Sequence, residues 1–233
     1  MNQNNSILKI KQVLFVVLFI ETLIITIAFA RAAFLDISPK TYFNEIDDRG
    51  YVTYISFLQL IIAAVLAKKI SRIAKFSSKL RKSSSVWLIC SIVLFFLALD
   101  DLVGIHEQID LWIHDLFELE KTNLTDLIDD FIVGLYLVLV TIFLAFQWQN
   151  LKIFNPVFIF FKIGFILALA MIILDLVSNN TLFISKIIEN ETLQSEIQQW
   201  LGAVEDSIKI YAEGLFMVGI YGCWQIANSL RSQ

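Results

Sequence analysis

One stretch of the chain, from Leu97 to His114, holds both histidines of the protein beside several carboxylates. At 100° per residue, its charged side chains fall within an arc of about 120° on a helix, and apolar side chains fill the opposite face. Carboxylates beside imidazoles suit Mn²⁺, Fe²⁺, Zn²⁺ or Ca²⁺, and such a metal can activate water or oxygen. The polar stripe comprises Asp100, His106, Glu107, Asp110, His114 and Glu118.

The stripe predicts a metal-dependent site completed by acids at the start of the last apolar stretch. We expect Asp101 to act as a general base, with Glu205 and Lys209 also catalytic. Further acids begin or end other apolar stretches: Asp126, Asp129, Asp130 and Asp175. The predicted metal ligands are Asp100, His106, Glu107, Asp110, His114 and Asp206.

Known metal motifs do not match this pattern. The chain has no Glu-x-x-His, which ferritin-like di-iron bundles require, and no His-Glu-x-x-His. Two histidines cannot build a three-histidine zinc site. The motifs therefore identify neither the metal ion nor the substrate.

Each part of the proposed site also has a structural explanation. Negative charge is favourable at a helix N-terminus, which would account for Asp129 and Asp130. Glu205, Lys209 and Glu213 recur at intervals of four residues, so their charges partly offset one another. Gly104 could end the third apolar helix and leave 105–118 as a separate amphipathic helix.

Asp100 and Asp101 are the hardest to explain structurally, because they follow an unbroken apolar run. They point about 100° apart on a helix, so we expect two different partners.

Two segments, LALDDLVGIHEQI (97–109) and VEDSIKIYAEGLF (204–216), carry a resemblance. They resemble an uncharacterised family of multi-pass bacterial membrane proteins, with a D-D-x4-H-E motif and an E-D-x2-K motif opening the last helix. The resemblance implies that seven residues act together. These are Asp100, Asp101, His106, Glu107, Glu205, Asp206 and Lys209.

The elements that must position these residues are apolar helices. The chain is 58% hydrophobic, against about 45–50% in soluble domains, and only 17% charged. A membrane-spanning helix needs about 20 mostly apolar residues. We predict one all-α membrane bundle over 1–233, with six transmembrane helices. Their ranges are 12–34, 51–67, 86–105, 128–148, 156–178 and 207–229.

Charge fixes the predicted orientation of these helices. Seven basic residues and no acid lie between 68 and 82, so the loop 68–85 and both termini should be cytoplasmic. Of the 22 acidic residues, all but Glu21 and Glu213 fall at the outer side. We expect a bacterial cytoplasmic membrane. Glu21 also favours an uncleaved first helix over a signal peptide.

The basic segment 68–82 has two interpretations. It could form a short amphipathic helix that binds anionic lipid headgroups, or it could act only as a topology signal. The expected partners are membrane lipids and no nucleic acid. The sequence identifies no protein partner.

Glu21 and Glu213 are the acids inside apolar segments. By helical rise, Glu21 lies about 14 Å into the first helix from its start, and Glu213 lies about 9 Å from the outer end of the sixth. With Gln59, they could form a proton or cation path, or interhelical hydrogen bonds that fix packing.

Three functions follow. The first is a metal-dependent enzyme acting on a lipid or other amphiphile, the second a proton- or cation-coupled transporter, and the third a non-catalytic accessory subunit of a membrane complex.

Overall fold

The computed structural model describes residues 3–35, 50–120, 128–179, 184, 188 and 190–231. Regular structure in these ranges is helical, and none of them forms a strand, which confirms the all-α prediction. The helices are α1 (Gln3–Leu35), α3 (Tyr51–Phe76), α4 (Ser84–Val103), α5 (Ile105–Phe117), α6 (Ile128–Phe146), α7 (Trp148–Leu151), α8 (Phe158–Asn179) and α10 (Glu191–Arg231). Two 3-10 turns join them, η1 (Arg81–Ser83) and η3 (Lys152–Val157).

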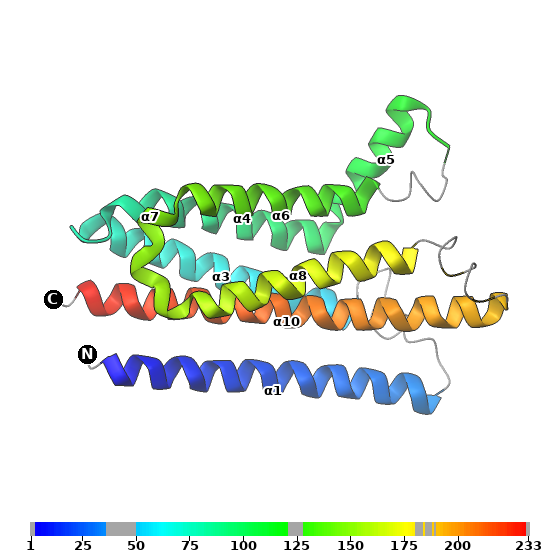
Figure 1. Cartoon of the computed structure of the whole chain (residues 1–233), viewed down its shortest axis with the longest axis horizontal. Coiled ribbons are helices and arrows are strands. Elements are labelled where there is room, and N and C mark those ends of the chain that lie inside the picture. Colours follow the sequence, from blue (N-terminus) through cyan, green and yellow to red (C-terminus); the bar gives the residue numbers. More distant parts are fainter. Residues whose placement is uncertain are drawn as a thin grey trace.

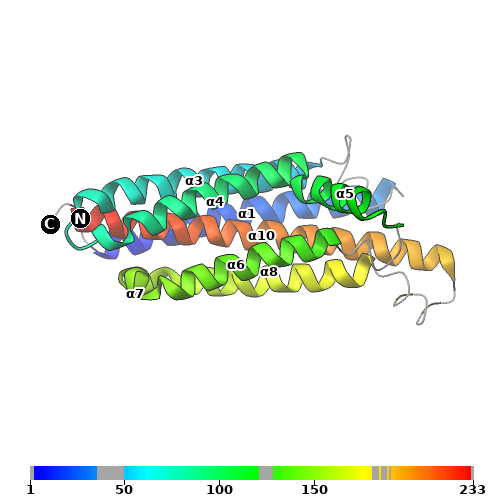
Figure 2. The same ribbon diagram turned by 90° about the horizontal axis from the view of Figure 1, so that it is seen from above.

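The long helices run side by side along the long axis of the molecule, with α10 at the centre (Figure 1). The helix α10 packs against α1, α3 and α8, and α4 packs on α3. Seen from above, α3 and α4 lie on one side of α10, and α6 and α8 lie on the other (Figure 2). The beginning of α1 and the end of α10 lie at one end of the bundle, and α5 projects from the other (Figure 1).

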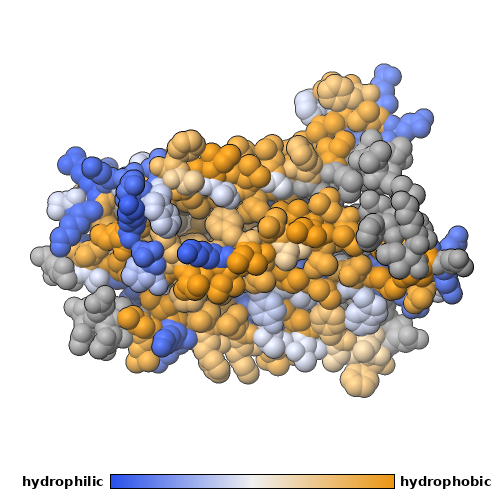
Figure 3. All heavy atoms as spheres, viewed as in Figure 1, coloured by the Kyte–Doolittle hydropathy of each residue, from blue (hydrophilic) through white to orange (hydrophobic). Residues whose placement is uncertain are grey.

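Four helices are long and apolar enough to cross a membrane, which indicates an integral membrane protein. These stretches are Ile7–Phe34, Thr53–Phe76, Arg81–Val103 and Trp148–Ser178. A broad hydrophobic band covers the middle of the visible face, and hydrophilic side chains gather at the end where α7 lies (Figure 3). The shorter apolar helix Phe131–Phe146 belongs to α6.

The central helix α10 is not among these four stretches, although it runs the length of the bundle. Polar groups such as Lys209, Glu213 and Gln225 make it less apolar than its neighbours. Its position explains this composition. A helix surrounded by other helices presents few side chains to lipid, so it can carry polar groups that bond to those helices.

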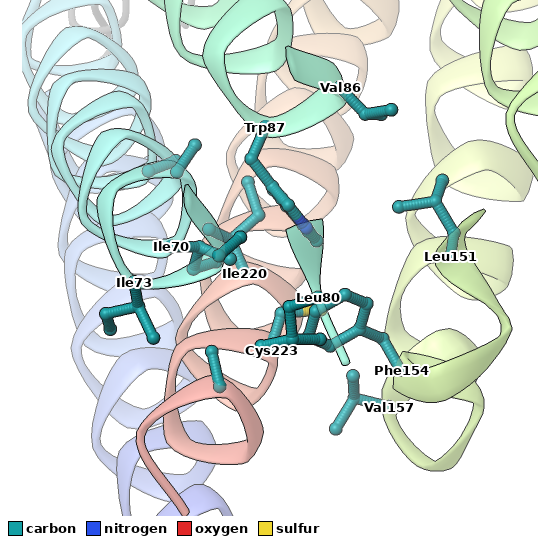
Figure 4. Close-up of a cluster of buried hydrophobic side chains, with 14 of the residues drawn as sticks. Ile70, Ile73, Leu80, Val86, Trp87, Leu151, Phe154, Val157, Ile220 and Cys223 are labelled. Carbon is teal, nitrogen blue, oxygen red and sulfur yellow. The ribbon is translucent and has the colours of Figure 1, made fainter. Parts of the chain in front are cut away.

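The main hydrophobic core lies toward the end of the bundle where the chain begins and ends (Figure 4). The ring of Trp87 on α4 meets Phe154 in η3 edge to face, with centroids 5.2 Å apart. Ile70 from α3 and Cys223 from α10 are fully buried in the same cluster. The core thus joins three layers of the bundle at that end.

The basic segment 68–85 differs from the predicted loop. Helix α3 continues to Phe76, nine residues beyond the expected 67, and no separate interfacial helix forms there. The reason is tertiary, because Ile70 and Ala74 are fully buried in the core between the basic residues. Lys69 lies over the Trp224 ring, 5.8 Å from its centroid. Contact of this segment with anionic headgroups stays a prediction.

Candidate functional site

A glycine turn joins α4 to α5 at the end of the bundle opposite the core. Gly104 adopts φ +67°, and its N–H donates to the carbonyl of Asp100 at 2.7 Å. A left-handed residue that bonds back in this way ends a helix, and glycine adopts it without steric cost. The expectation that Gly104 ends the third helix is therefore confirmed.

Asp100 uses both carboxylate oxygens to hold the start of α5. Its Oδ1 accepts the backbone N–H of His106 at 2.8 Å, and its Oδ2 lies 3.0 Å from His106 Nδ1. The aspartate is buried, so this contact is shielded from water. In this position Asp100 satisfies an N–H of the first turn of α5 and orients the imidazole. Its predicted role as a metal ligand stays a prediction.

This contact favours the protonated form of His106. The hydrogen bond to Asp100 is the largest cause that raises the His106 pKa above its ordinary value. Burial and Lys209 oppose the rise, and the negative charges of Asp100 and Glu107 add to it. The α4–α5 corner is thus most strongly held when His106 carries its proton.

The pH dependence of the corner can be predicted with its sign. Because the folded-state pKa of His106 is raised, its contribution to stability is full below about pH 6.5, the unfolded value, and is lost as pH rises through the folded value. NMR titration of the two imidazoles should show a raised pKa for His106 that Asp100→Asn lowers.

His106→Asn is the control, because an amide can still donate to Asp100 but does not titrate. Its unfolding temperature should lack the decline that the natural protein shows as pH rises through the His106 pKa. Equal pH profiles in the two proteins would contradict this assignment.

A second carboxylate–histidine pair lies one turn apart on α5. His114 Nδ1 is 3.1 Å from Asp110 Oδ1, and both side chains are buried. The opposite face of α5 exposes large apolar side chains, among them Trp112 and Phe117. The predicted polar stripe therefore exists, and its middle part faces the protein. Glu107 and Glu118 at its ends are exposed.

Asp101 finds a different partner from Asp100, as the helical geometry predicted. Its Oδ1 forms an ion pair with the ammonium of Lys209 on α10. Helices α4 and α10 both pack against α3. The long side chain of Lys209 on α10 spans the distance to Asp101 on α4. Lys209 also interacts electrostatically with Asp206 and Glu213. The structure thus brings the two sequence motifs together through the predicted catalytic residues Asp101 and Lys209. The third predicted catalytic residue, Glu205, is half-buried.

Breaking this ion pair should cost stability. Removing one partner of a fully buried pair costs about 3–5 kcal/mol, and we expect about 1–3 kcal/mol for Asp101→Asn because Lys209 is only partly buried. The double variant Asp101→Asn/Lys209→Gln should recover part of that loss, because it leaves no unpaired charge.

Chemical unfolding in detergent would give the coupling free energy of this double-mutant cycle. Asp115→Asn, at an exposed position on α5, is the control and should be neutral. If the changes in unfolding free energy of the two single variants add up to that of the double variant, the ion pair does not stabilise the fold.

A buried junction of three helices lies next to the ion pair. Gln59 on α3 donates from Nε2 to Glu21 Oε1 on α1 at 2.7 Å, and Glu21 is only 1% exposed. Glu21 lies near the middle of the apolar stretch Ile7–Phe34 of α1. On α10, a Cβ at Gly214 would lie 1.9 Å from the same Oε1. Only glycine leaves room for this carboxylate.

Several buried atoms around the junction have no hydrogen-bond partner among the described groups. Glu213, which precedes Gly214, interacts electrostatically with Glu21, Asp101 and Lys209 and faces Ser56. Buried polar atoms are nearly always partnered in folded proteins, so these atoms are the candidates to bind a proton, a water molecule or an ion. The atoms are Glu21 Oε2, Ser56 Oγ, Gln59 Oε1, Asp101 Oδ2 and Glu213 Oε2.

Sequence reasoning identified the two acids and Gln59, but missed Ser56 and Gly214. A serine or glycine in an apolar helix gives no periodic signal. Their importance follows only from what α1 and α10 place beside them.

Gly214 allows a matched test of the junction. Gly214→Ala should destabilise the protein by about 1–3 kcal/mol, because the methyl group collides with Glu21 and displaces its bond to Gln59. Gly202→Ala on the same helix meets nothing within 4 Å and should be neutral or stabilising by up to about 1 kcal/mol. Thermal unfolding would measure both, and equal effects would contradict close packing at Glu21.

The described residues contain no group of three or more His, Cys, Asp or Glu side chains placed to hold a metal ion. His106 and His114 each bond to a separate aspartate rather than to a common centre. Asp126 and the side chains of Asp129 and Asp130 lie outside the described part of the structure. The divalent metal site at the outer end stays a prediction.

Comparison with known proteins gives one match. A family model described as a domain of unknown function, DUF8692, matches residues 12–224. This range runs from α1 to the last part of α10 and includes the polar network. No curated protein and no solved structure matches the chain.

Proposed function

The chain belongs to the DUF8692 family, and we propose that it is a proton- or cation-coupled membrane transporter whose coupling site is the Glu21 junction. Six helices, α1, α3, α4, α6, α8 and α10, would cross a bacterial cytoplasmic membrane. The positive-inside rule would put both termini in the cytoplasm. The α5 end of the bundle, with its carboxylate–histidine pairs, would then face outward.

One observation carries the proposal. Glu21 is buried in a membrane helix, and one of its oxygens has no hydrogen-bond partner among the described groups. An ionised carboxylate in such a place is costly unless a proton or a cation compensates it. Because Glu213 adds a second carboxylate close by, the junction calls for more positive charge than Lys209 supplies.

The arrangement of polar groups supports access from one side. From the α5 corner inward, titratable groups follow one another as His106, Asp101, Lys209, Glu213 and Glu21. The opposite end is filled by the apolar core. Exchange between the two sides would therefore require the core helices to move, as alternating access demands.

The enzyme and accessory-subunit hypotheses have less support. The three-ligand geometry that a metal enzyme needs is not found among the described residues. An accessory subunit would need only interhelical packing, which explains Gln59 and Gly214 but not the unpartnered carboxylate oxygens.

Proton flux in reconstituted vesicles tests the proposal. A pH-sensitive dye inside the vesicles should report flux, driven by a potassium diffusion potential, that depends on the protein. Glu21→Gln and Glu213→Gln should reduce it to the level of protein-free vesicles, because an amide cannot bind and release a proton. Asp115→Asn should leave it unchanged.

If flux persists in both glutamine variants, the junction is not the coupling site. If the natural protein moves protons only with a second solute, screening of solutes under the same potential would identify the substrate class. No solute-dependent flux of protons or cations in any condition would exclude the transporter.

A further inference from the structure

We infer that Glu21, Ser56, Gln59 and Glu213 bind a sodium ion between α1, α3 and α10. This inference rests on the proposed function, because it identifies the coupling ion of the same site. The four side chains come from three helices: Gln59 bonds to Glu21, Ser56 faces Glu213, and the two carboxylates interact electrostatically.

The unpartnered atoms of these side chains are all oxygens. They are Glu21 Oε2, Ser56 Oγ, Gln59 Oε1 and Glu213 Oε2. Glu21, Ser56 and Gln59 are each less than 10% exposed, so bulk water does not satisfy them. Oxygen ligands of mixed charge are what hard cations prefer.

The junction holds these oxygens in place before any ion binds. Gln59 Nε2 is committed to Glu21 Oε1, so the amide oxygen must turn the other way. The same Oε1 packs against the backbone at Gly214, which leaves Oε2 as the available oxygen of Glu21. Glu213 lies immediately before Gly214 on α10 and faces Ser56. Preorganisation of this kind reduces the cost of binding.

A proton alone satisfies this set poorly. Three of the four atoms are acceptors, and the hydroxyl of Ser56 can donate to only one of them. One added proton supplies one further donor, whereas a cation contacts several oxygens at once. A cation therefore accounts for more of the unpartnered atoms.

The ligand set also selects among cations. Transition metals favour nitrogen and sulfur ligands, and these four atoms include neither. Calcium takes about six to eight oxygens, more than the side chains supply, and magnesium retains several waters. Lys209 is paired with Asp101, so its charge is largely offset near Glu213. A monovalent ion together with one proton balances the charges of Glu21 and Glu213 and fits the small number of ligands.

The test measures the unfolding temperature of the full-length protein in detergent against NaCl, with choline chloride holding ionic strength constant. Sodium should raise the unfolding temperature in a saturable manner. Ser56→Ala removes the hydroxyl that faces Glu213, so it should bind sodium about tenfold more weakly.

Ser207→Ala is the matched control. Its hydroxyl on α10 is buried and bonds to the carbonyl of Ala203, one turn earlier on the same helix. Its sodium response should equal that of the natural protein. An equal loss in both serine variants would overturn the site.

A CaCl₂ titration and the proton-flux assay distinguish sodium binding from binding of a divalent ion or of a proton. Stabilisation by micromolar CaCl₂ but not by NaCl would overturn the inference in favour of a divalent ion. No response to either ion, with proton flux that still depends on Glu21, would overturn sodium binding and leave the proposed transporter intact. Absence of both cation binding and flux would remove both proposals.

Discussion

The side chain of Glu21 constrains how α1, α3 and α10 pack against one another. Lipid tails are as apolar as the helices, so helices associate in a membrane through close packing and hydrogen bonds rather than through the hydrophobic effect. Glu21 requires a glycine opposite it, at Gly214, and an amide donor beside it, at Gln59. The α10 backbone and α3 must therefore approach α1 closely at this level, and any displacement leaves a carboxylate buried without its donor.

The bundle has two halves that differ in chemistry. One end is an apolar core in which Trp87, Phe154 and residues of α10 interlock. The other half is joined by polar contacts, including the ion pair from Asp101 to Lys209. Buried polar groups are often no more stabilising than well-packed apolar ones.

The spacing of the acidic motif has a local mechanical explanation. Asp100 reaches forward across the glycine turn to His106, and Asp101, one residue later, points away to Lys209. Two adjacent aspartates thus hold the α4–α5 corner and connect it to the central helix. Because His106 lies in electrostatic range of Lys209, the proton state of the corner is linked to the network that reaches Glu21.

The sequence alone determined the helical class, the presence of long apolar helices and which residues carry charge inside apolar segments, because these depend on composition and local periodicity. It also implied two different partners for Asp100 and Asp101, since 100° per residue separates them on any helix. Only the tertiary structure decided that α3 extends through the basic segment, since burial of Ile70 in the core is a contact between distant residues. It likewise decided that the histidines pair with separate aspartates, and that Ser56, in an apolar helix, faces Glu213. Those outcomes depend on how α1, α3 and α10 rotate against one another, and a single sequence does not encode that rotation in any local pattern.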